Sequence, residues 1–436
     1  MTVDAETFRT APLDEQAASE IAARGLEVRL AEDDAAALAW RAAVARGFQG
    51  PELEERNHEA GRPGTAYRRR LGVYDPAGAL PDLPVATFAT WLSELTVPGG
   101  RAVPASAISS VTVAATHRRR GLARSLMAGE LRQAVQAGLP VAMLTASEAT
   151  IYGRFGFAAA AAAATWRIDT LRAGWLGGDV PGRIDYVSRA DARRIAPELH
   201  ERIRHRLPGE VIVPGPHWDD MLRLRSDAEA AGAVRAIQYR DETGEIQGLA
   251  AFTLDRTPPT PGTVSVIFLH AATDHAYAAL WRFLLEHDLV GTVVATERAI
   301  DEPLWWLVAD QRAAEIKLRD HQYVRIVDVV AALEARHYEV AGSVILDVTD
   351  PLGITSGRYL LEAADDGAAR VRVLADSETT NAAPVLALGI GELSAIYLGG
   401  VRVQTLAAAG RVRADAVEEA DALFRGAVTP RLTFWY

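Results

Sequence analysis

The stretch 108–157 constrains the fold of this chain more than any other part of it. It opens with a β-branched run at 108–113, which predicts a buried strand. An arginine-rich turn follows, and apolar residues at helical spacing then predict a helix that begins at Leu122 and stops at Gly138 and Pro140. The apolar run 141–144 predicts a second strand. The sequence therefore predicts a strand–helix–strand unit with a basic glycine turn before its helix.

The turn itself carries the chemistry of a phosphate site. Unpaired N–H groups and the positive end of the helix dipole let the first turn of a helix hold a pyrophosphate. Gly121 allows close approach to the backbone, and the flanking arginines add positive charge. The turn has neither the Lys-Ser/Thr pair of a P-loop nor the three glycines of a dinucleotide fingerprint. On spacing alone, a solvent-exposed basic helix start remains the alternative.

Two motifs carry a resemblance to a known family. Residues 118–123, RRRGLA, match the Arg/Gln-x-x-Gly-x-Gly/Ala acetyl-CoA signature of the GNAT N-acetyltransferases, and residues 146–157, ASEATIYGRFGF, are similar to the narrower Eis (enhanced intracellular survival) family. The resemblance implies an α/β fold with two tandem GNAT-like domains, the second degenerate, followed by a sterol carrier protein-like domain. We expect these domains at 1–174, 175–319 and 320–436.

The resemblance also implies the residues of an acetyl-CoA site in the first domain. Backbone groups of the opening strand would pair with the pantetheine arm, as strand edges do with extended ligands. The basic turn would hold the pyrophosphate, and two residues after the second strand would lie beside the co-substrate. The implied set is Val111, Thr112, Val113, Arg118, Arg119, Arg120, Gly121, Leu122, Ala123, Arg124, Ser147 and Glu148.

Two tyrosines are the implied catalytic residues. A phenol with a pKa of ~10 can protonate a departing thiolate with a pKa of ~8.5, and the resemblance gives this role to Tyr152. The chain ends in LTFWY, and the family implies that the α-carboxylate of Tyr436 reaches the active site as the base. Its ordinary pKa of ~3.5 would need to rise through burial, or the group would relay a proton through water. A tail packed for stability alone is the alternative.

The rest of the chain predicts mixed sheets. Strands at 70–74 and 85–92 precede the central unit, and a helix capped at Asp33 or Asp34 precedes them. The middle third repeats the outline with strands at 249–254 and 264–269, a helix at 274–289 and a strand at 292–296. Its turn, HAATDHAY, lacks the glycine and the arginines, so we expect no acetyl-CoA there. The alanine run 158–164 fits a helix or a buried strand, and 1–25 are expected to be loosely structured.

The last third predicts a strand–helix layer. We expect a helix within 324–338, strands at 343–348, 357–362 and 369–374, and helices around 386–398 and 414–424. The sequence by itself does not indicate a lipid tunnel in this layer, because a fold does not fix a function.

Composition narrows the class of protein. The 436 residues are 49% hydrophobic and 24% charged, which is ordinary for a large globular enzyme. No run is apolar and long enough for a membrane span, and the polar N-terminus does not resemble a signal peptide, so a cytoplasmic protein is expected. A formal charge of −11 disfavours nucleic acid as a partner. The chain has no cysteine and no zinc-type histidine pair, so we expect no metal.

These observations favour an N-acetyltransferase in which an amine attacks acetyl-CoA directly. The expected acceptor is a small polycationic amine such as an aminoglycoside. A cluster of acidic residues and one histidine could attract it, although a solvated helix face explains the same cluster: Glu52, Glu54, Glu55, His58 and Glu59. A protein lysine acetyltransferase and a non-catalytic lipid- or ligand-binding protein are the alternatives. The family also implies a homo-oligomer, a hexamer.

Overall fold

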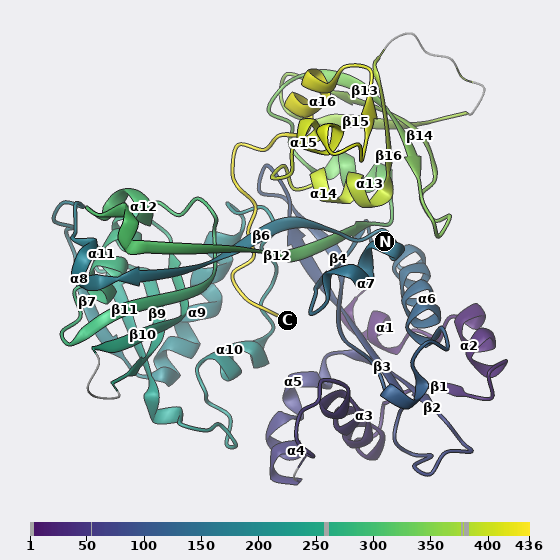
Figure 1. Ribbon diagram of the computed structural model, residues 1–436, viewed down its shortest axis with the longest axis horizontal. Helices are drawn as coiled ribbons and strands as arrows, with labels where there is room; N and C mark the ends of the chain where they lie inside the picture. The colour runs from purple at the N-terminus through teal and green to yellow at the C-terminus, as the bar shows by residue number, and fades with distance from the viewer. Residues whose placement is uncertain (1–3, 54, 257–260, 376–377, 379–382) are drawn as a thin grey trace. The chain divides into compact units, whose positions relative to one another are not determined.

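The computed structural model describes residues 1–436 except 1–3, 54, 257–260, 376–377 and 379–382 (Figure 1). It divides into two compact units. Unit 1 comprises 1–160, 322–427 and 436, and unit 2 comprises 161–321 and 428–435. Two strands, β6 (Ala158–Asp169) and β12 (Ala314–Ile326), have residues in both units.

The N-terminal part of unit 1 is a mixed sheet with strands in the order β1-β2-β3-β4-β5, followed by the 322–326 part of β12. The strands are antiparallel except for β4 and β5, which run parallel with α6 between them in sequence. The bounds are β1 (Glu27–Leu30), β2 (Arg69–Tyr74), β3 (Ala86–Thr96), β4 (Ala102–Val113) and β5 (Val141–Thr145). The predicted strand–helix–strand unit is confirmed.

Helices cover both faces of this sheet (Figure 1). Because neighbouring residues of a strand face opposite sides, Phe88 packs with Leu126 of α6, whereas Ala89 packs with Trp40 of α3. The helices are α1 (Ala5–Thr10), α2 (Glu15–Ala22), α3 (Asp34–Gly47), α4 (Glu55–Gly61), α5 (Pro63–Ala66), α6 (Leu122–Gln136) and α7 (Ala149–Tyr152). The expected cap at Asp33 is confirmed, since its side chain accepts from the Ala36 N–H.

The C-terminal part of unit 1 is a five-stranded sheet in the order β15-β14-β13-β16-β17 with four helices. Its elements are α13 (Val329–Ala335), β13 (Gly342–Thr349), β14 (Gly357–Ala363), β15 (Ala369–Leu374), β16 (Val385–Gly389), α14 (Ile390–Ile396), α15 (Val403–Ala408), β17 (Arg413–Ala414) and α16 (Val417–Phe424). The three predicted strands at 343–374 are confirmed.

Unit 2 repeats the outline of the first sheet in the strand order β6-β11-β10-β9-β8-β7. Only β10 and β11 are parallel, and α11 lies between them in sequence. The elements not yet named are α8 (Thr170–Ala173), β7 (Arg183–Val187), α9 (Arg189–Arg204), α10 (Gly215–Met221), β8 (Val234–Arg240), β9 (Ile246–Asp255), β10 (Gly262–Ala271), α11 (Asp274–Leu285), β11 (Val290–Arg298) and α12 (Leu304–Leu307).

Several local predictions were wrong or left open. The N-terminal segment is not loose: α1 and α2 are capped by Asp4 and Asp14, and they bury Phe8 and Ile21. The predicted helix at 324–338 is confirmed only over α13, because 324–326 pair with β5. Likewise 386–388 pair with β13 rather than forming helix, Ala414 lies in β17, and α11 ends at Leu285. The alanine run is a strand, β6.

Candidate active site

The site begins where β4 and β5 diverge. These parallel strands pair from Ala105–Val141 to Ile108–Leu144, and beyond that point the described pairings join β4 only to β3. A bulge at the same place, with Ser110 at φ 54°, turns β4 away. The backbone of Val111 to Val113 is thereby left with an edge open to an extended ligand.

The basic turn lies at the start of α6. Gly121 caps the helix in the left-handed conformation, at φ 79°, and offers no side chain to accept from the first N–H groups. Arg119 is also left-handed, at φ 63°. Alternation of this kind points successive N–H groups toward one place, which suits an anion. A missed contributor is Arg24, whose guanidinium lies 3.2 Å from the position a Cβ on Gly121 would take.

A cavity of about 630 Å³ opens beside this turn. Seven predicted residues line it: Val113, Arg118, Arg119, Gly121, Leu122, Ala123 and Arg124. The other predicted co-substrate residues do not: Val111, Thr112, Arg120, Ser147 and Glu148. The Thr112 side chain is turned away, since its hydroxyl is 2.6 Å from that of Thr87 and its Cβ lies against Gly47. The structure thus brings together the core of the predicted phosphate site.

Residues that sequence reasoning missed complete this cavity. His117 and Arg154 line it, and the His117 ring lies 3.1 Å from Asp75, which lowers the pKa of that carboxyl. Pro351 and Leu352 reach it from the loop after β13. The spacing of these residues along the chain gives no local signal for such a grouping.

The loop that carries Leu352 is fixed by a buried ion pair. Arg325 of β12 pairs with Asp350 at 2.6 Å and donates to the Phe155 carbonyl at 2.8 Å. Asp350 also accepts from the Ile354 N–H. The 350–355 loop is therefore fastened to the segment that carries Tyr152.

Tyr152 ends α7, close to the divergence of the strands. Its ring is 9% exposed and lies against Phe157 and Tyr323, and Tyr323 in turn pairs with Leu144 of β5. Burial raises the pKa of the phenol, and the Glu148 carboxylate adds to the rise. The side chain therefore stays protonated at neutral pH, as a proton donor must.

The C-terminus lies at the same divergence. The Tyr436 carboxylate accepts from Thr145 Oγ1 at 2.6 Å, and Thr145 directly follows the last residue of β5 that pairs with β4. The Tyr436 side chain is 6% exposed, donates to Gln322 at 3.1 Å and packs edge-on against Trp91. Burial raises the pKa of its phenol, so the phenol stays protonated at neutral pH.

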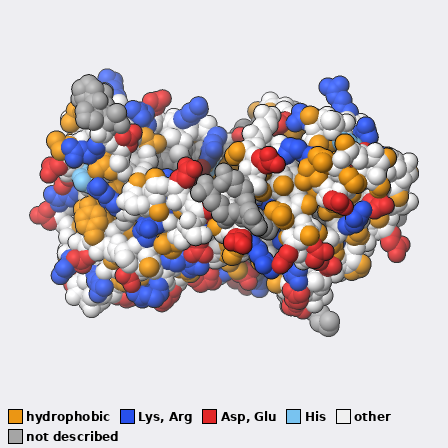
Figure 2. All heavy atoms as spheres, turned by 90° about the horizontal axis from the view of Figure 1, so that it is seen from below, with side chains coloured by type: hydrophobic (Ala, Val, Ile, Leu, Met, Phe, Trp, Pro, Cys, Tyr) orange, Lys and Arg blue, Asp and Glu red, His pale blue; other side chains and the backbone are white. Residues whose placement is uncertain are grey.

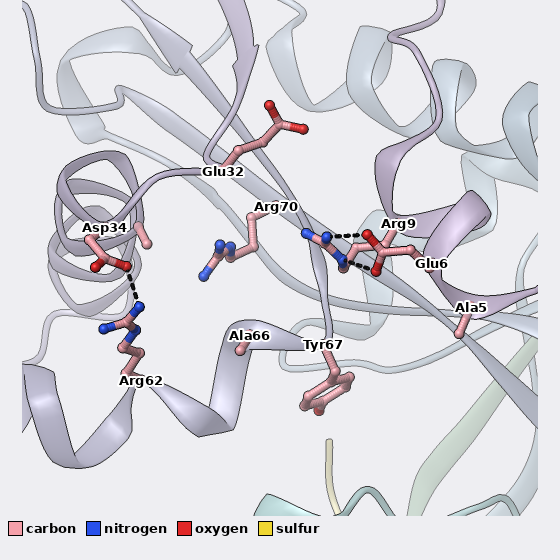
Figure 3. A pocket seen from close by; sticks show the side chains of 10 residues that line it. Ala5, Glu6, Arg9, Glu32, Asp34, Arg62, Ala66, Tyr67 and Arg70 are labelled. Carbon is pink, nitrogen blue, oxygen red and sulfur yellow. Dashed lines mark hydrogen bonds and ion pairs between the residues drawn. The ribbon is translucent and has the colours of Figure 1, made fainter.

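A second cavity, of about 540 Å³, lies between α1, α3 and α5 (Figure 3). Glu6 pairs with Arg9, and Asp34 pairs with Arg62, each at 2.6 Å. Glu32, Tyr67 and Arg70 also line it. Of the residues expected to border an acceptor site, Glu52 and Glu59 are exposed and are not among the described lining residues. Glu54 and the side chains of Glu55 and His58 lie outside the described residues.

This geometry defines a class of protein. Diverging parallel strands, a bulge on one of them and a basic turn at the following helix are the features of a coenzyme A-dependent acyltransferase. Residues 27–160 and 209–326 each match the model of an acetyltransferase (GNAT) domain, and residues 329–433 match a sterol carrier protein domain. The chain is an acetyltransferase with two GNAT domains and a sterol carrier protein domain, and it uses acetyl-CoA.

Individual relatives narrow the class to a family. The chain is 40% identical over 409 residues to an N-acetyltransferase of Streptomyces avermitilis, covering 90% of this chain and 94% of the relative. It is 34% identical to N-acetyltransferase Eis of Mycobacterium tuberculosis, covering 82% and 87%. The crystal structure of Eis1 from Mycobacterium abscessus matches with a TM-score of 0.78 and 29% identity, over 94% of this chain and 100% of that one. The chain belongs to the Eis family of GNAT N-acetyltransferases.

Three further expectations concern metal binding, membrane helices and surface charge. Within the described ranges, His, Asp and Glu form no group of three that could hold a metal ion, and the expected independence of metal stays a prediction. None of the described helices has both the length and the apolar character needed to cross a bilayer. On the face drawn in Figure 2, basic and acidic side chains are interspersed, so that face has no continuous basic surface.

Proposed function

We propose that this acetyltransferase acylates an amine of a small polycationic acceptor, such as an aminoglycoside, by direct attack in a ternary complex. The observation that carries the proposal is the C-terminal carboxylate held by Thr145 at the divergence of β4 and β5. An anionic group at that point attracts an ammonium and accepts its proton. The similarity to N-acetyltransferase Eis also favours acetyl transfer to a nitrogen atom.

Each residue has a separate task in this reaction. The turn around Gly121 holds the pyrophosphate, and the open edge of β4 orients the pantetheine arm. The nitrogen of the acceptor forms a bond to the acetyl carbon as the carbon–sulfur bond breaks. The Tyr436 carboxylate takes the amine proton, directly or through water, and the Tyr152 phenol gives its proton to the leaving sulfur and regains one from solvent.

One carboxylate of the second cavity supports a cationic acceptor. Glu32 lines this cavity and has no ion pair among the described residues, whereas Glu6 and Asp34 pair with Arg9 and Arg62. The formal charge of the whole chain is −11. A negative field raises the local concentration of cations. Protein lysines are a second candidate acceptor for the same chemistry. The cytoplasmic location stays a prediction, and so does the hexamer that the family implies.

The test is to append one glycine after Tyr436. The added residue moves the terminal carboxylate away from Thr145, and we expect turnover to fall on the order of 10²-fold, the lower end of the usual range for general acid–base groups. Tyr436→Phe is the matched comparison, because it removes the phenol and keeps the carboxylate. Thiol release from acetyl-CoA with a panel of aminoglycosides, polyamines and lysine peptides measures both.

The panel also separates the alternatives. Turnover with several aminoglycosides supports the proposal, and turnover with lysine peptides alone would move the assignment to protein modification. Full activity of the extended chain would leave the tail with a packing role only. Binding of acetyl-CoA with no turnover on any amine would contradict the proposed acceptor class.

A further inference from the structure

One arginine of the second cavity, Arg70, forms no ion pair among the described residues. Glu6 and Arg9 form one ion pair at its wall, and Asp34 and Arg62 form another. Arg70 of β2 points into the space between these two pairs (Figure 3). Within the described residues, no ion pair includes Arg70, and its buried Nε has no hydrogen-bond partner.

This state is costly for a buried cation. Arg70 is only 7% exposed, and burying part of a charged group without a hydrogen-bond partner is unfavourable. Burial lowers the pKa of Arg70, and the neighbouring cations Arg9 and Arg62 lower it further. Three guanidiniums and three carboxylates therefore line the cavity, and Arg70 is the guanidinium that forms no ion pair within the described residues.

The neighbouring residue on the same strand shows how the chain satisfies a buried arginine when it has only a structural role. Arg69 points to the opposite face of β2. Its guanidinium pairs with Glu130 at 3.1 Å and also donates to the carbonyls of Ala11 and Pro12. Arg70 has no such set of acceptors, although it is buried almost as deeply.

Aromatic side chains pack in series from this cavity to Tyr436. Tyr67 lines the cavity and packs edge-on against Trp91, with 5.6 Å between ring centroids. Trp91 packs in the same way against Tyr436, at 5.5 Å. An acceptor that reaches from Arg70 along these rings would bring an amine toward the Tyr436 carboxylate.

We propose that Arg70 binds a carboxylate of the acceptor, so that the preferred acceptor is a cationic amine that also carries an acid group, such as a basic amino acid or a short peptide with a free carboxyl terminus. The planar guanidinium suits a carboxylate because it can donate two parallel hydrogen bonds. Glu32, which lines the same cavity and has no ion pair among the described residues, is available to a second ammonium. The inference rests on the proposed acetylation of a cationic amine and narrows the acceptor: an aminoglycoside, which carries no carboxylate, is then a poorer acceptor than a basic amino acid or a short peptide.

Matched acceptors test the inference directly. Lysine and cadaverine differ only by the carboxylate, and the tripeptide Gly-Gly-Lys can be compared as free acid and as carboxamide. With the unaltered chain, we expect kcat/KM to be at least about tenfold higher for the acid of each pair, the effect of one charge-assisted bidentate contact. Thiol release from acetyl-CoA is the measurement.

Variants then assign the preference to Arg70. Arg70→Met should lower kcat/KM for the acids about tenfold and leave that for cadaverine and the carboxamide within about twofold, and Arg70→Lys should restore part of the preference. Arg29→Met is the control, because Arg29 is a half-exposed arginine of β1 that pairs with Glu27 outside the cavity. It should keep the full preference.

The outcomes distinguish the carboxylate site from the amine acetylation on which it rests. Equal turnover of acid and non-acid partners by the unaltered chain, or a preference that survives Arg70→Met, would overturn the carboxylate site and leave amine acetylation intact. No turnover with any amine would overturn both. If Arg70→Met does not fold, as thermal unfolding would reveal, the matched pairs on the unaltered chain and on Arg70→Lys still decide the question.

Discussion

The two GNAT domains contain the same strand–helix–strand outline and begin their helices in opposite ways. In unit 1, Gly121 caps α6 without a side-chain bond, and arginines surround the open N–H groups. In unit 2, the Thr273 hydroxyl accepts from the Ala276 N–H at 3.1 Å, and Asp274 lies in the first turn of α11. The Thr273 cap takes up one N–H group of the first turn, and the Asp274 carboxylate repels a phosphate, so this helix start suits an anion less well than that of α6.

The place where the parallel strands diverge also differs between the two units. In both domains pairing stops partway along the central strand, after Ile108 in β4 and after Val266 in β10. Arg298 of β11 then donates to the Leu269 carbonyl at 3.1 Å, and Glu302 pairs with Arg298 at 2.9 Å. Leu269 follows Val266 by three residues, as Val111 follows Ile108. The edge that is open in unit 1 is therefore occupied by a side chain in unit 2.

The comparison shows how the same strand–helix–strand arrangement can bind a co-substrate in one domain and serve only as a folded scaffold in the other. The second copy replaces the ligand's contacts with its own: a hydroxyl for the phosphate at the helix start, and a guanidinium for the amide groups of an extended arm. Each replacement supplies a hydrogen-bond partner to a backbone group. Without that partner the group would be buried unsatisfied, which is energetically costly. The degenerate domain is stabilised by the contacts that end its binding capacity.

The largest expected effect is on stability in unit 2. Arg298→Met removes from the buried Glu302 the nearer of two cations, at 2.9 Å, and leaves Arg431 at 3.7 Å. Breaking a buried pair costs about 3–5 kcal/mol in general, and we expect the lower end of that range because Arg431 remains. Although burial opposes ionisation of Glu302, Arg298 holds its pKa below the usual range. Denaturant unfolding measures the loss, and acetyl-CoA affinity of the folded variant should not change. Unchanged stability would show that Arg298 is not needed to fill the divergence.

The next effect is on chemistry in unit 1. Tyr152→Phe removes the proton donor and should lower kcat on the order of 10²-fold, with little change in the KM for acetyl-CoA. Because burial raises the Tyr152 pKa, the unaltered chain should keep its activity as pH rises through the ordinary phenol range, near ~10. Steady-state thiol release over about pH 8–11, a range that includes both sides of that ordinary value of about 10, measures both. Unchanged turnover would remove Tyr152 from the mechanism.

A smaller effect is expected when the helix start of unit 1 is made to resemble that of unit 2. Arg124→Glu places an acid in the first turn of α6, as Asp274 does in α11. A helix-end charge is worth about 1–2 kcal/mol in favourable geometry, so the KM for acetyl-CoA should rise about tenfold. Arg124→Gln, which removes the charge without reversing it, should raise the KM less. Equal KM values for the two variants would argue against an electrostatic role for this turn.

The smallest effect comes from the cap of unit 2. Thr273→Ala removes the hydroxyl that accepts from Ala276 and should cost about 1 kcal/mol of stability, as helix N-caps generally do. Thermal unfolding measures the change. Turnover at a temperature well below unfolding should stay the same, and a loss of turnover there would mean that α11 contributes to the reaction.

The sequence predicted what depends on neighbouring residues. The helix after Gly121 and its two strands follow from apolar spacing and from the glycine and proline that end the helix, and these signals are local. The alanine run stayed undecided because its propensity favours a helix while its flanks favour a strand. Pairing of β6 with β11 decides it, and such pairing is set by tertiary contacts. The same competition explains why 324–326 and 386–388 are strands.

The parts of the site that could not be predicted are those that join distant residues. The contact of Thr145 with the Tyr436 carboxylate spans 291 positions. The cavity beside Gly121 takes Leu352 from the loop after β13, and the unpaired Nε of Arg70 depends on acceptors that the other described elements do not supply. These long-range contacts cannot be predicted from residue spacing or periodicity, because they form only when the elements pack together.

The most direct test of the central comparison is the stoichiometry of acetyl-CoA binding, measured by isothermal titration calorimetry on the unaltered chain, on Arg124→Glu and on Thr273→Ala. The account predicts one acetyl-CoA per chain, weakened by Arg124→Glu and unaffected by Thr273→Ala. Two acetyl-CoA molecules per chain, or one that is weakened by the change at Thr273 and not by the change at Arg124, would contradict it.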